Sequence, residues 1–373
     1  MTVEAHRDGP LADIRVIDVA TIVAGPGAAK YLADFGADVI KVERPEGDTT
    51  RTMGWPDSRD GVSLWWKLLG RGKRTVVLDL KTDKGLDAMR RLCATADVLI
   101  ENFRPGTLER LGLAPDDLLA ANPKLVILRI SGFGQDGPYA NRPGFATMAE
   151  AMSGFASLNG EADGGPVLPP IALTDEVTAL VGAFAVMVAL HSGVGQVVDV
   201  NLLESLFQIM GPLASAFAVN GYEQPRLGSG IAYSVPRGTY RTKDDRWVAV
   251  STSAESVARR VMEMIGVGAD ERFATFAGRM EHRDEVEALM RGWIAARTEA
   301  EVLAAFEAAQ AAIAPVLSMA DIAVDPHYAA RGSIVDVDDT PMQGLVARLS
   351  KTPGRIRWSG RPLGADQDDV LGT

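Results

Sequence analysis

One aspartate stands where an acid could do chemistry. Asp175 lies in residues 171–177 (IALTDEV), where a Gly- and Pro-rich stretch leads into an apolar, helix-like run. A carboxylate at such a junction is a candidate catalytic group. The alternative is structural, because an acid in the first turn of a helix is common and complements the helix dipole.

A second candidate is the turn after the first predicted strand. Residues 21–27 (TIVAGPG) open a helix, and small residues there offer free backbone N–H groups and the positive end of the helix dipole to a phosphate or an adenine. Gly25 and Gly27 fit a GxGxxG pattern, but Lys30 stands in place of the third glycine. Glu43, at the end of the second predicted strand, could mimic the acid that binds the ribose in dinucleotide-binding folds. An NAD-dependent oxidoreductase is therefore an alternative. A tight connection without any ligand would also explain the glycines.

Basic residues gather in the first third of an acidic chain. The net charge of −11 argues against nucleic acid as a general partner. Residues 41–110 nevertheless hold fourteen Lys and Arg against eleven Asp and Glu, which suits a small polyanionic ligand. Arg44 and Lys81 follow predicted strand ends, where charge-assisted bonds to phosphates would form. Further basic positions of interest are Arg74, Arg104 and Arg110. The alternative is that all of these are solvated surface cations.

The elements that would position these residues have an α/β pattern. The predicted strands are residues 14–19, 39–42, 75–79, 98–101 and 125–130, and the predicted helices are residues 26–35, 84–95 and 115–121. Val- and Ile-rich strands that alternate with helices predict a doubly wound, Rossmann-like parallel sheet covered on both faces. Ligands of such sheets bind at the carboxyl ends of the strands.

The rest of the chain predicts a second, smaller domain. Long apolar helices are expected at residues 174–190 and 201–219. From residue 222 the pattern changes to a hairpin (residues 239–242 and 247–251) followed by amphipathic helices, which indicates an α+β domain. Short strands are expected again at residues 333–337 and 345–349. The predicted domains are therefore residues 1–221 (large α/β), 222–315 (small α+β) and 316–373 (a return to the large domain).

Several features argue against other protein classes. A single cysteine, Cys93, and four scattered histidines do not fit a disulfide framework or a clustered zinc motif. The N-terminus is polar and charged, and no apolar run approaches the roughly 20 residues that a membrane span needs. We therefore expect a cytoplasmic, metal-free protein.

An ordered series of motifs carries a family resemblance. The motifs are residues 10–18 (PLADIRVID), 24–26 (AGP), 35–44 (FGADVIKVER), 73–74 (KR), 78–81 (LDLK), 101–106 (ENFRPG), 131–138 (SGFGQDGP), 142–145 (RPGF) and 195–200 (GQVVDV). This series, which spans nearly the whole chain, resembles the class III CoA-transferases, the formyl-CoA transferase-like family.

The resemblance implies roles for particular residues. It implies that Asp175 is a covalent nucleophile and that Gly228, Ser229 and Gly230 form a glycine loop over the active site. The residues that it implies for CoA binding are Ile22, Val23, Ala24, Arg44, Leu78, Lys81 and Arg110, and we count the basic Arg104 with them. It also implies acyl-CoA and carboxylic acid substrates and a homodimer of two interlocked chains.

The chemistry implied by the resemblance suits an aspartate. An unperturbed Asp has a pKa of about 3.9, so Asp175 would be ionised at neutral pH without a general base. Its attack on a thioester would give a mixed anhydride and CoA thiolate, which would then form an aspartyl-CoA thioester. No ATP, metal or redox cofactor is required. A mobile glycine loop could exclude water and offer N–H groups to the oxyanion.

Two further alternatives share this fold. An α-methylacyl-CoA racemase would need an acid–base pair after its Arg-x-Gly motif, whereas Phe145 and Ala146 follow Arg142-Pro143-Gly144 here and can carry no proton. The histidines, His6, His191, His282 and His327, all lie outside that motif. A catalytically silent acyl-CoA-binding protein is the other alternative, and the presence of Asp175 argues against it.

Overall fold

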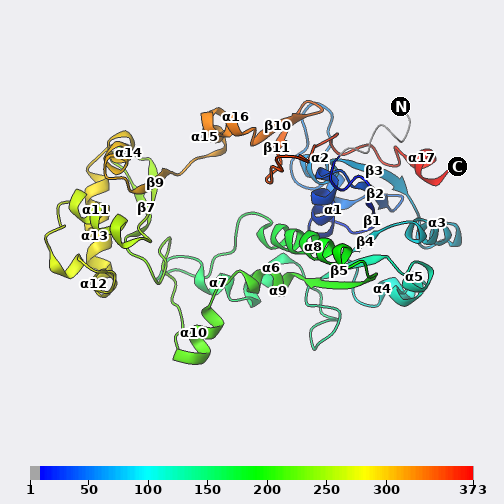
Figure 1. Ribbon diagram of the computed structural model, residues 1–373, viewed down its shortest axis with the longest axis horizontal. Coiled ribbons are helices and arrows are strands. Elements are labelled where there is room, and N and C mark those ends of the chain that lie inside the picture. Colours follow the sequence, from blue (N-terminus) through cyan, green and yellow to red (C-terminus); the bar gives the residue numbers. More distant parts are fainter. Residues whose placement is uncertain (1–8, 373) are drawn as a thin grey trace. The chain divides into compact units, whose positions relative to one another are not determined.

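A computed structural model describes residues 9–372, which form two compact units (Figure 1). The first unit contains residues 9–155, 168–211 and 326–372, and the second contains residues 156–167 and 212–325. Each unit is described by itself below. These units describe compactness and do not test the predicted domain limits at residues 221 and 315, which stay a prediction.

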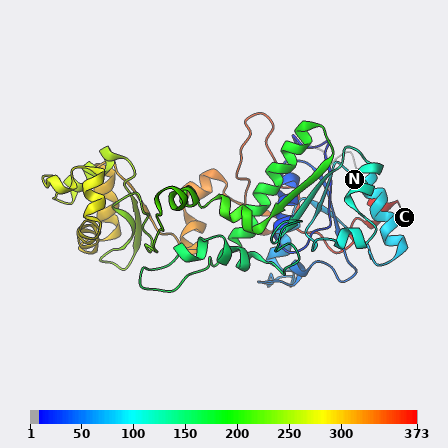
Figure 2. The ribbon, with the colours of Figure 1, turned by 90° about the horizontal axis from the view of Figure 1, so that it is seen from below.

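A six-stranded parallel sheet forms the centre of the first unit (Figure 2). Its strands, in the spatial order 3-2-1-4-5-6, are β1 (Arg15–Asp18), β2 (Asp38–Glu43), β3 (Lys73–Val77), β4 (Val98–Glu101), β5 (Val126–Ser131) and β6 (Gln196–Asn201). All neighbouring strands run parallel. The predicted parallel α/β sheet is confirmed. Since the chain direction is shared, the carboxyl ends of all strands meet at one edge, which we call the carboxyl edge.

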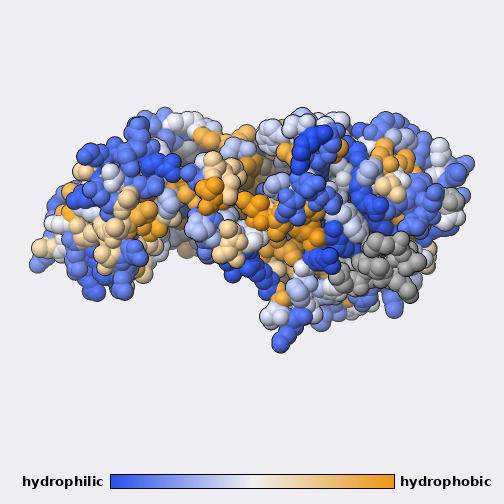
Figure 3. All heavy atoms as spheres, turned by 90° about the horizontal axis from the view of Figure 1, so that it is seen from above, coloured by the Kyte–Doolittle hydropathy of each residue, from blue (hydrophilic) through white to orange (hydrophobic). Residues whose placement is uncertain are grey.

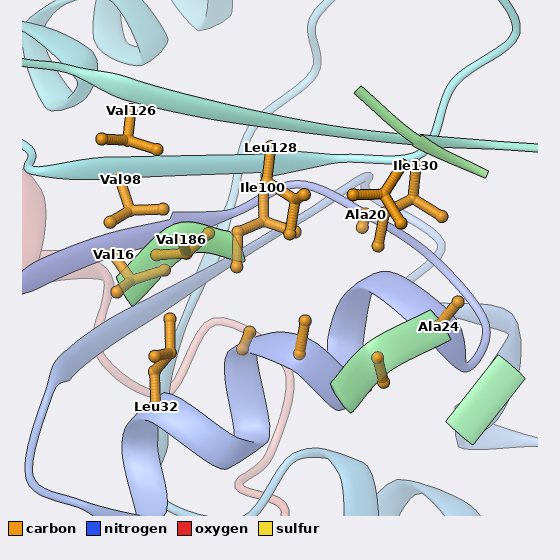
Figure 4. Packing of buried hydrophobic residues seen from close by; sticks show 14 of the residues in the cluster. Val16, Ala20, Ala24, Leu32, Val98, Ile100, Val126, Leu128, Ile130 and Val186 are labelled. Atoms are coloured by element: carbon orange, nitrogen blue, oxygen red, sulfur yellow. The ribbon is translucent and has the colours of Figure 1, made fainter. Parts of the chain in front are cut away.

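Side chains alternate between the two faces of the sheet, and each face has its own apolar core. Val16, Val98 and Leu128 point to the core shared with α1 (Ala24–Asp34) and α8 (Leu173–Ser192), as Figure 4 shows. Ile17 and Leu99, their neighbours in the chain, point to the opposite core. This second core is closed by α3 (Asp83–Ala94), α4 (Thr107–Arg110) and α5 (Pro115–Ala121). The continuous Val and Ile runs are therefore those of strands buried on both faces.

Shorter elements complete the first unit. They are the 3-10 helix η2 (Thr49–Arg51), the helices α2 (Leu64–Leu69), α6 (Ala146–Met152), α9 (Leu202–Gln208), α16 (Pro326–Arg331) and α17 (Gln367–Leu371), and the antiparallel pair β10 (Ile334–Val337) and β11 (Thr340–Gln343). The expected strand at residues 345–349 is wrong, because β10 pairs with β11 through a tight turn at Asp338 and Asp339, both with positive φ. α6 packs against α8 and α9.

The C-terminal segment covers the edge of the sheet at β3. The backbone N–H of Thr75 donates to Asp366 (2.8 Å), and that of Val77 donates to the side chain of Gln367 (2.8 Å). The side chain of Gln367 also donates to the carbonyl of Val77 (3.1 Å). Side chains from the end of the chain thus occupy hydrogen-bonding groups that an edge strand would otherwise expose.

Helix α8 corrects one expectation from the sequence. Its 20 residues have a mean hydropathy of 1.7 in an 18-residue window, which is long and apolar enough to cross a membrane by length and composition alone. Core helices of soluble proteins meet the same criterion, and α8 packs against α1 and the sheet through Gly182, Val186 and Ala189. The expected helix at residues 201–219 is also corrected: it is divided into α9 and α10 (Leu213–Asn220), because Gly211, at φ +65°, and Pro212 interrupt it.

The second unit is built around a three-stranded antiparallel sheet. Its strands are β7 (Arg237–Arg241), β8 (Trp247–Ser251) and β9 (Ala312–Pro315), and the predicted hairpin corresponds to β7 and β8. Its helices are α7 (Phe155–Leu158), α10, α11 (Glu255–Met264), the 3-10 helix η3 (Glu271–Phe273), α12 (Phe276–Glu281), α13 (Arg283–Ala295), α14 (Glu299–Ala308) and α15 (Met319–Val324). An apolar core that includes Tyr240, Val248 and Phe306 holds this unit together.

Candidate active site

Asp175 is an unpaired carboxylate in the first turn of α8. Within residues 9–372 its side chain forms no hydrogen bond and no ion pair, and it is only partly exposed. Burial, together with the smaller effect of the negative charges of Glu150 and Glu176, raises the pKa of this carboxyl to about 6. Asp175 is therefore more basic than an ordinary aspartate, yet still ionised in most molecules at neutral pH.

Its neighbour in the chain has a different environment. The Tyr31 hydroxyl donates to the carboxylate of Glu176 (2.9 Å), and the Lys30 ammonium lies 3.9 Å from the same carboxylate. Lys30 also lies over the Tyr31 ring, 4.2 Å from its centroid. These contacts join α8 to α1 and partly offset the charge of Glu176. Asp175 has no such partner.

A third carboxylate, Glu150 on α6, is buried beside the same turn. The Thr174 hydroxyl donates to Glu150 (3.1 Å), and the Thr178 hydroxyl donates to the backbone carbonyl of Thr174 (2.7 Å). Sequence reasoning missed Glu150. The available signal was a single acid within the otherwise uncharged helix segment ATMAEAM.

The turn after β1 is held by side chains from neighbouring strands. Asn102 accepts from the N–H of Thr21 (2.8 Å) and donates to its carbonyl (2.7 Å). Lys41 donates to the carbonyl of Ala20. Ile22, which follows Thr21, has a φ of +68°, a left-handed conformation that is strained for a β-branched side chain. The hydrogen bonds of Ala20 and Thr21 hold the backbone just before Ile22. Strained residues of this kind cluster at binding and active sites.

Buried charged side chains on the neighbouring strands also stabilise this turn. The Lys73 ammonium bonds to the carboxylate of Asp18 (2.8 Å) and to the carbonyl of Pro26 (2.7 Å) at the start of α1. Lys41 lies 3.6 Å from Asp18 and 3.1 Å from Asp48. Burial lowers the pKa of Lys73 to about 8. The cluster fixes the position at which α1 begins.

The basic residues predicted to bind CoA follow the carboxyl ends of neighbouring strands. Arg44 follows β2, Lys81 follows β3 and Arg104 follows β4, and all three are exposed. Exposed Arg110 lies at the end of α4, after β4, where it donates to Thr107 (2.7 Å). The structure thus places Arg44, Lys81 and Arg104, together with Ile22, at the carboxyl edge, and Arg110 on the helix that follows β4.

Other predicted positions are less accessible. The side chains of Val23, Ala24 and Leu78 are buried, so that any contact with a ligand falls to their backbone or to a small part of the side chain. Arg74 is nearly buried and binds Asp38 (2.7 Å) at the start of β2, which is the opposite edge of the sheet. Its role is structural.

Asp175 belongs to the carboxyl edge as well. α8 leads directly into β6, which runs parallel to the other strands, so the helix begins on the side of the sheet where the strands end. The hydrogen bond between Glu176 and Tyr31 confirms that its first turn adjoins α1.

The predicted glycine loop lies in the second unit, where its backbone is anchored. Arg237 donates to the carbonyls of Ser229 (2.7 Å) and Gly230 (3.1 Å). The Ser229 hydroxyl accepts from the N–H of Thr239 (2.9 Å), and the N–H of Gly228 donates to Gly160 (3.0 Å). The role of this loop at the active site stays a prediction.

The site geometry weakens two alternatives. Arg51 binds the carboxylate of Glu43 through two hydrogen bonds of 2.7 Å, and the N–H of Asp48 donates to the same group (2.9 Å). Glu43 is therefore already occupied as a structural acid and does not fit a ribose-binding role. His191 lies in the last turn of α8, whereas Asp175 lies in the first, so this pair cannot act on one α-carbon. Within residues 9–372, no three His, Cys, Asp or Glu side chains gather as metal ligands would.

Known proteins are similar to this chain along nearly its whole length. The family described as CoA-transferase family III matches residues 11–367. Succinyl-CoA--D-citramalate CoA-transferase of Chloroflexus aurantiacus is 36% identical, over 97% of this chain and 93% of that protein. Succinate--glutarate CoA-transferase of Agrobacterium fabrum is 37% identical, over 100% of this chain and 97% of that protein. The crystal structure of a CAIB/BAIF family protein from Brucella suis has 31% identity and a TM-score of 0.87, and covers 98% of this chain and 99% of that chain.

Proposed function

The chain belongs to CoA-transferase family III, and on that premise we propose that Asp175 is the covalent nucleophile with which it moves CoA between two carboxylic acids. One observation carries this proposal: Asp175 is a half-buried carboxylate at the carboxyl edge, without a partner among residues 9–372, and its pKa is raised to about 6. A partly desolvated, unpaired carboxylate is a stronger nucleophile than a solvated one, and no general base is needed to ionise it.

The proposed reaction conserves the thioester bond. An oxygen of Asp175 attacks the thioester carbonyl, the C–S bond breaks, and CoA leaves as a thiolate while a mixed anhydride forms. The thiolate then attacks the Asp175 carbonyl of the anhydride, which releases the donor acid as a carboxylate and leaves an aspartyl-CoA thioester. The acceptor carboxylate repeats both steps in reverse. No proton, electron or phosphate is consumed, so the cycle requires no prosthetic group.

CoA would lie along the carboxyl edge, near the point where the strand order reverses. The order 3-2-1-4-5-6 supports a doubly wound, Rossmann-like arrangement, in which ligands bind beside the first strand. The rigid turn at Ile22–Ala24 would receive the adenine end. The exposed cations would hold the phosphates through charge-assisted bonds; they are Arg44, Lys81, Arg104 and Arg110.

The relatives suggest which acids are exchanged. One is named for succinyl-CoA and D-citramalate, and the other for succinate and glutarate. Each name pairs two dicarboxylic acids. We therefore propose succinyl-CoA as the donor and a small dicarboxylate as the acceptor.

An apolar stripe on α8 supports the proposed interlocked homodimer. Leu180, Phe184 and Val188 are spaced four residues apart on one face of the helix, and each is more than half exposed, at 53%, 70% and 54%. Apolar side chains reach the surface at several places, as the orange areas in Figure 3 show. Exposed apolar stripes of this kind mark protein contacts. A cytoplasmic location likewise remains a prediction.

Trapping the intermediate tests the proposed nucleophile. Hydroxylamine added during turnover should convert Asp175 to a hydroxamate, which peptide mass spectrometry would locate. Asp175→Ala should lose transfer activity while circular dichroism and CoA binding stay close to wild type. Substantial activity in Asp175→Ala, or a hydroxamate on another residue, would refute the assignment.

A further inference from the structure

Glu150 occupies a position that its own helix does not explain. It is the one charged residue of α6, and only 4% of it is exposed. Within the described residues, its carboxylate has a single side-chain partner, the neutral hydroxyl of Thr174, and no ion pair. Burial of an unpaired carboxylate is costly, and an apolar side chain of similar size would avoid that cost. The position of Glu150 therefore calls for a functional reason.

Its single contact leads to the nucleophile. Thr174 is fully buried and directly precedes Asp175 in the first turn of α8. The hydrogen bond from Thr174 to Glu150 joins α6 to that turn, and Thr178 fixes the carbonyl of Thr174 from the next turn. A shift of Glu150 would therefore move the backbone that carries Asp175.

The surrounding charges leave Glu150 as the main negative neighbour of Asp175. On α8, Glu176 is bound by Tyr31 and lies near Lys30 of α1. On α9, the charged residue is Glu204, which is exposed and accepts a hydrogen bond from Asn201. Among the charges that raise the pKa of Asp175, Glu150 has a larger effect than Glu176, although burial contributes most.

We propose that Glu150 is a positioning residue for Asp175, whose carboxylate orients the first turn of α8 through Thr174 and keeps the surroundings of the nucleophile negative. This inference rests on the proposed role of Asp175. A like charge raises the free energy of the free Asp175 carboxylate. Acylation removes the charge of Asp175, so the repulsion is relieved as the intermediate forms. Glu150 thus favours acylation without touching the substrate.

The substitution Glu150→Gln separates charge from shape. The amide oxygen can still accept from Thr174, while the negative charge is lost. We expect the acid limb of kcat/KM for acyl-CoA to move to lower pH by about 0.5 unit or more. At the pH optimum kcat should fall about tenfold, with little change in KM for acyl-CoA. A purely structural role would not move the acid limb.

Three variants serve as controls. Glu150→Asp keeps the charge and should keep the acid limb of the wild type. Glu176→Gln removes a charge that Tyr31 and Lys30 already offset, so it should shift the acid limb less than Glu150→Gln does. Thr174→Val removes the hydroxyl but keeps Glu150, and should lower kcat without moving the acid limb to lower pH.

The outcomes distinguish this inference from the proposed function. If Glu150→Gln has the wild-type pH profile and kcat while Asp175→Ala is inactive, only the role of Glu150 is wrong. If Asp175→Ala stays active, the proposed nucleophile itself is wrong. Should Glu150→Gln fail to fold, the variants Glu150→Asn and Glu150→Asp give the same comparison, because they match in size and differ in charge. If the acid limb of kcat/KM lies at the same pH in both, the inference is overturned.

Discussion

The Tyr31 hydroxyl donates a 2.9 Å hydrogen bond to Glu176, and this bond ties the first turn of α8 to α1. The two adjacent acids therefore differ: Glu176 joins α8 to α1, whereas Asp175 has no partner within the described part of the chain. Because the turn after β1 also leads into α1, the helix that begins at the proposed CoA site holds the helix that carries the proposed nucleophile.

The raised pKa of Asp175 predicts that this residue destabilises the fold at neutral pH. Its pKa is about 6 in the native state against 3.8 when exposed, so the native state binds the proton more tightly. The free energy of unfolding should therefore fall as the pH rises from about 4 to 6, and the deficit should be complete above that range. Asp175→Asn should raise stability by about 1–3 kcal/mol at pH 7.5 and by much less at pH 4. Thermal unfolding of both proteins at the two pH values measures this, and equal gains at both would contradict it.

Cations at the carboxyl edge should control the affinity for CoA. Arg44→Ala and Lys81→Ala should each raise KM for acyl-CoA by about 10-fold or more, since a charge-assisted contact contributes roughly 1.5–3 kcal/mol. The effect should shrink for thioesters that lack the nucleotide. Arg90→Ala is the matched control, because Arg90 is an exposed cation on α3 that pairs with Asp87 (2.9 Å). An equal rise in KM for all three variants would mean that only the net charge matters.

The two hydrogen bonds between Asn102 and the backbone of Thr21 should maintain the strained turn at Ile22. Asn102→Ala removes both bonds, and relaxation of the turn should raise KM for acyl-CoA several-fold while kcat changes little. The fold should lose about 1–3 kcal/mol, because two backbone groups lose their partners. Steady-state kinetics and urea unfolding together test this, and a fall in kcat alone would show that the turn acts on the chemistry instead.

The absence of an acid–base pair at Phe145 and Ala146 should prevent racemisation. We expect no deuterium at the α-carbon of a 2-methylacyl-CoA incubated with the enzyme in heavy water, whereas CoA should pass to a suitable free acid. Mass spectrometry reports both results in one sample. Rapid α-exchange without transfer would assign Asp175 as a base.

The apolar stripe on α8 should be covered in solution. An interlocked dimer should not separate on dilution to nanomolar concentration, because separation would require partial unfolding. Phe184→Glu should disturb assembly and produce aggregates or monomers, whereas Arg90→Ala should not. A monomeric wild-type protein in light scattering would contradict the proposed dimer.

Among the strands expected for the parallel sheet, the one that corresponds to β3 differs most from the structure. The strand at residues 98–101 agrees with β4, but the strand expected at residues 75–79 begins two residues earlier, at Lys73. The expected strand left out Lys73 and Arg74, whose partners in the structure, Asp18 and Asp38, lie on other strands. Pairing of buried charges depends on the tertiary structure, and spacing along the chain does not reveal it.

In the candidate site, too, some features could be predicted from the sequence, whereas others depend on the tertiary structure. Asp175 was singled out at the start of an apolar helix and the basic residues in the first third of the chain, and the family resemblance implied their roles. The parallel sheet explains why the segments that follow its strands share one edge. Glu150 could not be found in this way, since its importance depends on the packing of α6 against α8. The raised pKa of Asp175 was also missed, because an expectation of about 3.9 assumes a solvated carboxyl group.

The cover that the C-terminal segment provides for β3 has a consequence for synthesis on the ribosome. The backbone N–H groups of Thr75 and Val77 lack these partners until Asp366 and Gln367 have been synthesised, almost 300 residues later. Through that interval the nascent sheet has an open edge that can pair with another chain. The segment between them is therefore synthesised while this edge of the sheet is still uncovered, and Asp366 and Gln367 cover β3 only when they have been added.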